Sequence, residues 1–114
     1  MTAPFLRRAV LLLGPAVPRC SVVPARVIGT IRLIDGGELD DKILAVPVEG
    51  ALAGVRSVAQ LDAEFSGVTT ILSTFFENYK GRGKLQCSGF GSAEEAEQLV
   101  DRCSASFERF AAVR

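Results

Sequence analysis

Two runs of β-branched and aliphatic residues, separated by an acidic segment that contains glycine, constrain the fold of this chain more than any other feature. The runs are Arg26–Ile34 (RVIGTIRLI) and Lys42–Pro47 (KILAVP). Each has the length and composition of a largely buried β-strand. The segment between them begins Asp-Gly-Gly, and glycine supplies positive φ angles at no steric cost. The sequence therefore predicts a β-hairpin with a loop of about five to seven residues.

Apolar residues at helical spacing predict two helices in the second half of the chain, one over residues 66–80 and one beginning after Ser92. Between them, Lys84–Phe90 reads as a short strand, while residues 47–60 read as a loop. Ser92 and Glu95 have the spacing of a capping box at the start of the last helix. This order of elements predicts an α+β fold in which helices lie on a small antiparallel sheet. The expected apolar face of the last helix comprises Ala96, Leu99, Val100, Cys103, Phe107 and Phe110.

Composition limits the chain to one small globular domain, since 114 residues do not provide two independent cores. Basic and acidic residues number 13 each, which argues against a nucleic-acid partner held by bulk positive charge. The sequence has no histidine, which excludes Ser-His and Cys-His nucleophiles and the usual zinc sites. Its three cysteines include no Cys-x-x-Cys pair. The longest uncharged stretch near the start, residues 9–18, is too short to cross a membrane.

All charged side chains in the first 34 residues are positive, because five arginines precede the first acid, Asp35. An acid-free, Arg-bearing and Ala-rich start fits an organellar transit peptide. The apolar run Ala9–Leu13, which Gly14 and Pro15 follow, equally fits a first strand, and a secretory signal fits less well. We therefore divide the chain into residues 1–26, a divergent segment that is either a transit peptide or a replacement strand, and a domain over residues 27–114.

The acidic hairpin loop and a later basic group are the candidates for chemistry. The loop holds four acids within seven positions, and like charges repel unless water or a cation separates them. A solvated turn is the plain interpretation of this loop, and we interpret Glu38 and Asp41 as solvated loop acids. The second group is Tyr79-Lys80 followed by Arg82 and Lys84. Carboxylates bind hard cations such as Mg²⁺, and Lys, Arg and Tyr donate to phosphate oxygens, so the two groups together indicate phosphoryl-transfer chemistry.

Three ordered segments carry a resemblance to the C-terminal half of the soluble family I inorganic pyrophosphatases. They are IGTIRLIDGGELDDKILAVP, TFFENYKGRGK and GFGSAEEAEQLVDRCSASFERF, within about Val27–Phe110. The first resembles the family's strand followed by Asp-x4-Asp-x-Lys, and the second resembles its Phe-Phe-x-x-Tyr-Lys helix end. The third resembles its closing helix. The resemblance implies a partial OB-like antiparallel β-barrel flanked by two helices, and Mg²⁺-dependent hydrolysis of pyrophosphate to two phosphates.

Carried over residue by residue, the resemblance implies specific roles. Asp35 and Asp40 correspond to metal ligands, and Asp40 with Lys42 to the catalytic pair. Lys42 also corresponds to a phosphate contact, and the other substrate-binding positions are Tyr79, Lys80 and Lys84. For each position there is a plain structural alternative: a solvated turn for the aspartates, a packed helix-end aromatic for Tyr79, and surface charges for the lysines.

The family's signature, Asp-x-Asp-Pro-x-Asp, has no counterpart in this chain. Counted back without gaps, it falls on Ala3–Arg8 (APFLRR), where no position is acidic. Its aspartates gather metals and help to activate the attacking water. With two of the carboxylates left, the expected metal charge is weak, and concentrated metal charge is what lowers the pKa of a bound water. The expectation is a truncated family member with little or no activity alone.

Two other functions remain open beside this expectation: a non-catalytic interaction module, and a pyrophosphate-binding module without hydrolysis. The expected ligand is pyrophosphate with Mg²⁺, and the expected protein partners are further copies of the chain or an intact family member. The expected compartment is the cytoplasm, or a mitochondrion or plastid if residues 1–26 are a transit peptide.

Overall fold

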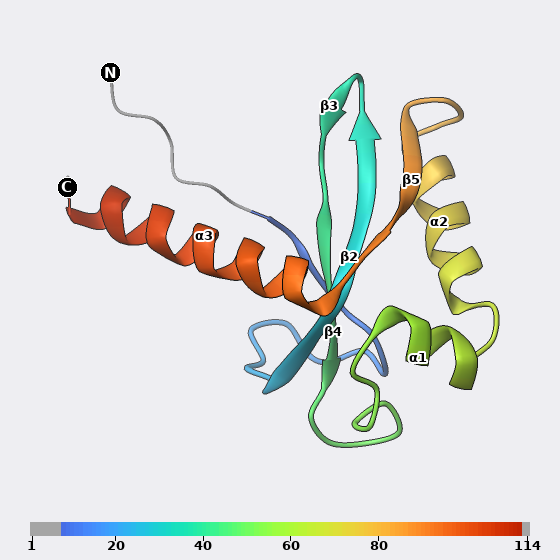
Figure 1. The fold of residues 1–114 in the computed structure, drawn as a ribbon, viewed down its shortest axis with the longest axis horizontal. Coiled ribbons are helices and arrows are strands. Elements are labelled where there is room, and N and C mark those ends of the chain that lie inside the picture. The colour runs from blue at the N-terminus through green and yellow to red at the C-terminus, as the bar shows by residue number, and fades with distance from the viewer. Residues whose placement is uncertain (1–7, 113–114) are drawn as a thin grey trace.

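The computed structural model describes residues 8–112, with side chains described as far as Ala105. Within these residues a five-stranded sheet is accompanied by three helices (Figure 1). The strands are β1 (Val10–Leu12), β2 (Ala25–Asp35), β3 (Glu38–Leu39), β4 (Lys42–Pro47) and β5 (Leu85–Gly91). The helices are α1 (Val58–Glu64), α2 (Val68–Asn78) and α3 (Ala93–Ala112). The α+β class predicted from the sequence is confirmed.

The long strand β2 is the centre of the sheet. It pairs antiparallel with β3, β4 and β5, and its register with β4 confirms the predicted hairpin. A register shift between Val27 and Gly29 marks a bulge in β2. The first strand, β1, pairs with β4 in parallel, so the sheet is mixed where a purely antiparallel one was predicted. Val10–Leu12, within the apolar run Ala9–Leu13, thus supplies a strand to the sheet.

The loop of the hairpin is tighter than the sequence predicted. Gly36 and Gly37 have φ angles of 59° and 87°, the signs that a two-residue type I′ turn requires. Because of this turn, Glu38 pairs with Asp35 and Leu39 with Ile34. The prediction of a loop of five to seven residues was wrong because the two glycines let the strands continue almost to the turn.

Helix α1 occupies part of the segment that was predicted to be a loop. Ser57 is its N-cap, and the side chain of Ser57 accepts a hydrogen bond from Gln60 N at 3.0 Å. The Gln60 amide in turn accepts from Arg56 N at 2.9 Å and donates to Gly54 O at 2.9 Å. The Ser-x-x-Gln spacing at residues 57–60 is a capping-box pattern, so the sequence carried a signal for this helix.

The main core lies between the sheet and helices α1 and α2. Its fully buried members include Ile31, Leu33 and Leu44 from the sheet and Leu61 from α1. A smaller cluster of Ile43, Ala96 and Leu99 seats the first turns of α3, which then projects away from the sheet (Figure 1). Of the predicted apolar face of α3, Ala96 and Leu99 are buried, but Val100 is 39% exposed. The side chains of Phe107 and Phe110 lie outside the described residues.

The start of α3 shows half of the predicted capping box. Ser92 Oγ accepts from Glu95 N at 3.2 Å, as predicted. The Glu95 carboxylate accepts from Arg32 Nη2 of β2, at 2.7 and 2.8 Å to its two oxygens, so it ties the helix to the sheet. In the described part of the chain, no helix has both the length and the apolar character needed to cross a membrane.

Candidate functional site

Asp35 is the last residue of β2 and sits at the edge of the glycine turn. It pairs with Glu38 on one side and with Leu85 of β5 on the other. Its carboxylate, whose side chain is 34% exposed, accepts a hydrogen bond from Lys80 Nζ at 2.8 Å. The structure therefore brings together two predicted site residues that lie 45 positions apart in the sequence.

The Lys80 ammonium is stabilised by this contact. The hydrogen bond from Lys80 to Asp35 and the negative charge of Asp35 raise the pKa of Lys80 above its ordinary value. The charge of Asp40 acts in the same direction. Lys80 therefore stays protonated to a higher pH than a free lysine, at the point where the ends of β2 and α2 meet.

A second ion pair of the same kind joins Asp40 and Lys42. Lys42 Nζ lies 3.1 Å from Asp40 Oδ2, and the lysine side chain is 14% exposed. Asp40 N donates to Leu33 O at 2.9 Å, which fixes Asp40 beside β2 just before β4 begins. In this structure each predicted metal-binding aspartate is thus bonded to a predicted phosphate-binding lysine.

Tyr79 is positioned by the end of α2. It is the C-cap residue, and its backbone N–H donates to Phe75 O at 2.9 Å. Its ring stacks on Phe75 with centroids 5.4 Å apart and an angle of 8° between the planes, and it meets Phe76 edge-on at 5.7 Å. The side chain is 48% exposed, so the ring is supported on one side and open on the other.

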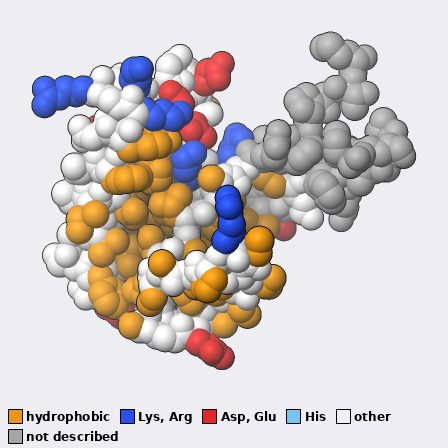
Figure 2. Space-filling view, turned by 180° about the vertical axis from the view of Figure 1, so that it is seen from behind, with side chains coloured by type: hydrophobic (Ala, Val, Ile, Leu, Met, Phe, Trp, Pro, Cys, Tyr) orange, Lys and Arg blue, Asp and Glu red, His pale blue; other side chains and the backbone are white. Residues whose placement is uncertain are grey.

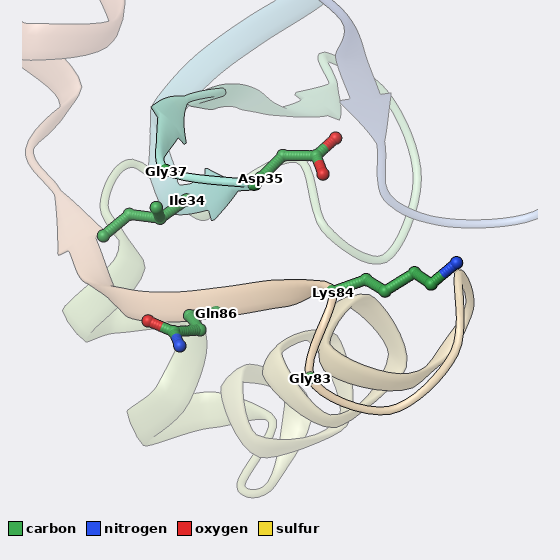
Figure 3. A pocket seen from close by; sticks show the side chains of 7 residues that line it. Ile34, Asp35, Gly37, Gly83, Lys84 and Gln86 are labelled. Carbon is green, nitrogen blue, oxygen red and sulfur yellow. The ribbon is translucent and has the colours of Figure 1, made fainter.

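A shallow pocket of about 370 Å³ lies between the glycine turn and the start of β5. Gly36 N donates to Lys84 O at 3.4 Å, which holds the two segments side by side. Figure 3 shows the side chains of Asp35 and Lys84 extending in the same direction from the facing segments. The pocket also contains Gln86, which sequence reasoning missed. Its position two residues after Lys84, in a predicted strand, was the available signal. The lining residues are Ile34, Asp35, Gly36, Gly37, Gly83, Lys84 and Gln86.

The acids of the hairpin do not form a preassembled metal site. Among the side chains that the structure describes, in residues 8–105, no group of three or more His, Cys, Asp or Glu is arranged to hold a metal ion. Asp35 and Asp40 each have a lysine as partner. Mg²⁺ is usually held by one or two carboxylates together with substrate phosphates and waters. The carboxylates of Asp35 and Asp40 are oxygen donors of the kind that suits a metal arriving with a phosphate ligand.

Glu38 and Asp41, which were predicted to be solvated loop acids, differ from each other. Glu38 is exposed in β3, as predicted. One carboxylate oxygen of Asp41, Oδ1, is buried and has no hydrogen-bond partner. The prediction is wrong for Asp41, whose carboxylate is partly buried.

The sequence and fold of this chain match those of known proteins. The family model described as inorganic pyrophosphatase matches residues 9–108. The inorganic pyrophosphatase of Xanthomonas campestris pv. campestris is 37% identical over 94 residues, which are 80% of this chain and 52% of the relative. That of Halalkalibacterium halodurans is 33% identical over 102 residues, 87% of this chain and 60% of the relative.

Solved structures agree with the sequence relatives. The type I inorganic pyrophosphatase of Toxoplasma gondii has a TM-score of 0.77 and 29% identity, and the match covers 89% of this chain and 47% of that one. A vacuolar soluble pyrophosphatase of Trypanosoma brucei has the same fold, with a TM-score of 0.81 at 17% identity, over 100% of this chain and 33% of that one. This chain therefore spans about half the length of the curated relatives that it matches. Given the extent of the family match and the agreement in fold, the chain belongs to the family I inorganic pyrophosphatases.

Proposed function

We propose that this chain binds magnesium pyrophosphate at the end of the β2–β4 hairpin and, on its own, hydrolyses it little or not at all. The observation that carries the proposal is the pairing of Lys80 with Asp35 and of Lys42 with Asp40. Each pair contains one group suited to phosphate and one suited to the metal that accompanies it. A magnesium pyrophosphate complex carries both complementary charges: negative phosphate oxygens for the lysines and a positive metal ion for the aspartates.

The phosphate side of the site consists of donors that converge on one end of the sheet. Lys80 and Lys84 supply cationic donors from the segment that links α2 to β5, and Lys42 supplies one from the start of β4. The hydroxyl group of Tyr79, a residue that is about half exposed, adds a neutral donor. Charge-assisted hydrogen bonds to phosphate oxygens are among the stronger polar contacts in proteins, so three lysines support binding in the absence of hydrolysis.

The proposed metal-binding aspartates are better suited to binding Mg²⁺ with its ligand than to catalysing hydrolysis. Hydrolysis of a phosphoric anhydride needs an activated water, and a water is activated by concentrated metal charge. Asp35 and Asp40 are the carboxylates proposed to contact Mg²⁺, and two carboxylates already bonded to lysines gather little such charge. We therefore expect affinity for the substrate of the family without its turnover.

The test is a calorimetric titration of the purified chain with magnesium pyrophosphate, alongside an assay of phosphate release. Binding with turnover far below that of an intact relative supports the proposal. Asp35→Asn and Asp40→Asn should weaken this binding, whereas Glu97→Gln, an exposed acid on α3, should leave it unchanged. Turnover equal to an intact relative and lost in both variants would contradict the inactivity, and the absence of heat at millimolar ligand would contradict the binding.

A role as an interaction module is the second candidate, and exposed hydrophobic residues on α2 favour it.

For the compartment we propose the cytoplasm, since the three cysteines are free thiols in the structure. A mitochondrion or plastid is the alternative if residues 1–26 form a transit peptide.

A further inference from the structure

Acidic and basic side chains also meet outside the candidate site. At the end of the molecule that holds the hairpin turn, charged side chains of both signs gather above a largely hydrophobic surface (Figure 2). A separate pocket of about 470 Å³ lies between the hairpin and the first turns of α3. Its lining includes the acids Asp41 and Glu95 and the bases Arg8 and Arg102. We call it the α3 pocket, and none of its lining residues belongs to the candidate site.

Thr30, in the middle of β2, contributes an unpaired hydroxyl to this pocket. The residue is 1% exposed, and its Oγ1 atom is buried with no hydrogen-bond partner among the described residues. Side chains alternate along a strand, so Thr30 faces α3 while the next residue, Ile31, lies in the main core. A buried hydroxyl without a partner costs free energy, and this cost is removed when a ligand supplies the partner. The hydroxyl of Thr30 therefore points to a ligand with a hydrogen-bonding group.

Two carboxylates lie close to this hydroxyl. A Cβ atom on Gly91 would overlap both Thr30 Oγ1 and Glu95 Oε2, so these oxygens flank one point that the glycine leaves open. The hydrogen bond to Glu95 and the charge of Glu95 raise the pKa of Arg32 above its ordinary value, and the charge of Asp41 adds to this effect. Asp41 is therefore within electrostatic reach of the same ion pair. Glu95 already accepts from Arg32, whereas Asp41 Oδ1 is buried and unpaired, so Asp41 is the acid left to receive a cation.

The mixed charges of the α3 pocket favour a ligand that carries both signs. An ammonium group has three N–H donors, so it can donate to Asp41 and to Thr30 together. Arg102 repels a simple cation but donates to a carboxylate. A metal ion fits less well, because the arginines oppose its charge and Mg²⁺ requires six oxygen ligands. Leu39, which is 76% exposed, and Leu99, which is 8% exposed, add an apolar wall.

We propose that the α3 pocket binds a free amino acid with an aliphatic side chain. The ammonium group of the amino acid donates to Asp41 Oδ1 and Thr30 Oγ1, and its carboxylate accepts from Arg102. Its side chain covers Leu39 and Leu99. The volume of the pocket lies in the range of small-molecule sites, and its few polar contacts indicate a dissociation constant in the millimolar range. This site is independent of the binding proposed for magnesium pyrophosphate.

The first experiment titrates L-leucine into the full 114-residue chain and follows the backbone amides by NMR, in reductant because the cysteines are free and without pyrophosphate. Amide shifts at Thr30, Asp41 and Arg102 that saturate with millimolar leucine support the proposal. Isoamylamine lacks the carboxylate of leucine and 4-methylpentanoate lacks its ammonium group, so each should bind about tenfold or more weakly. The absence of saturating shifts with leucine, equal affinity for isoamylamine, or the same shifts with magnesium chloride alone overturns the proposal.

The second experiment assigns the contacts with variants. Asp41→Asn and Arg102→Met should each raise the dissociation constant for leucine about tenfold or more. The matched control is Asp101→Asn, at an exposed acid of α3 that does not line the pocket, and it should leave the constant unchanged.

Thr30→Val separates binding from folding. It should weaken leucine binding and yet raise the denaturation midpoint of the ligand-free chain, because it replaces an unpaired buried hydroxyl with a methyl group of similar shape. If Thr30→Val does not fold, Asp41→Asn and Arg102→Met still decide the question. Leucine binding that survives both Asp41→Asn and Arg102→Met, or that Asp101→Asn weakens equally, overturns the proposal.

Discussion

Lys80 Nζ lies 2.8 Å from Asp35 Oδ2, and this ion pair joins the end of α2 to the end of β2. Both side chains are partly exposed, at 43% and 34%. An exposed pair of this kind contributes little to folding, because water screens the charges and ordering two side chains costs entropy. The ion pair matters because of where it lies: it places a cation and an anion side by side at the edge of the candidate site.

The first prediction concerns Lys80. Lys80→Met should lower the affinity for magnesium pyrophosphate about tenfold or more, because it removes one charge-assisted donor. It should leave the free energy of unfolding nearly unchanged, because water screens an exposed ion pair. Calorimetry and denaturant unfolding measure the two quantities separately. Arg102→Met on α3 is the control, and an equal loss of affinity there would mean that general charge, and not this site, attracts the ligand.

The pKa of Lys80 supplies the second prediction. The hydrogen bond to Asp35 and the charge of Asp35 raise this pKa above the ordinary value of 10.5. A group whose pKa is raised by folding stabilises the fold fully below its unfolded pKa, and this contribution is lost as the pH rises through the folded pKa. An NMR titration of labelled lysine side chains should show Lys80 titrating above 10.5, and Asp35→Asn should return it toward that value. A Lys80 resonance that Asp35→Asn does not move would contradict the ion pair.

The third prediction concerns the close approach of β2, β5 and α1 at Gly29. A Cβ atom there would lie 2.6 Å from Gly91 O and would overlap Val58 Cγ2. Gly29→Ala should therefore destabilise the chain by about 2–3 kcal/mol, since backbone and side chain must both move. Gly54→Ala is the matched control, because a Cβ at Gly54 meets nothing within 4 Å. Equal stability of the two variants in denaturant unfolding would show that the sheet is looser at this point than the structure indicates.

The hairpin was predictable because its information is local. Strand composition in residues 26–34 and 42–47 and the Gly36-Gly37 pair each act over a few positions. The pairing of Asp35 with Lys80 is set by the packing of α2 beside β5, which no local pattern encodes, so the resemblance predicted both residues but not their contact. The parallel pairing of β1 with β4 is non-local in the same way. Helix α1 was missed for another reason: its start signal at Ser57 was present but its helix is only seven residues long.

That short helix provides the last prediction. Ser57 Oγ accepts from Gln60 N at 3.0 Å, and α1 contributes Leu61, which is 1% exposed, to the core. Ser57→Ala leaves a helix-end N–H unpaired and should cost about 1 kcal/mol in the free energy of unfolding. Ser57→Asp should retain most of the stability, because a carboxylate accepts the same hydrogen bond and suits the positive end of the helix. Ser66→Ala, at an exposed serine in the turn after α1, is the control. If Ser57→Ala and Ser57→Asp unfold at the same denaturant concentration as the unsubstituted chain, the cap does not stabilise α1, and the packing of Leu61 alone holds this helix on the sheet.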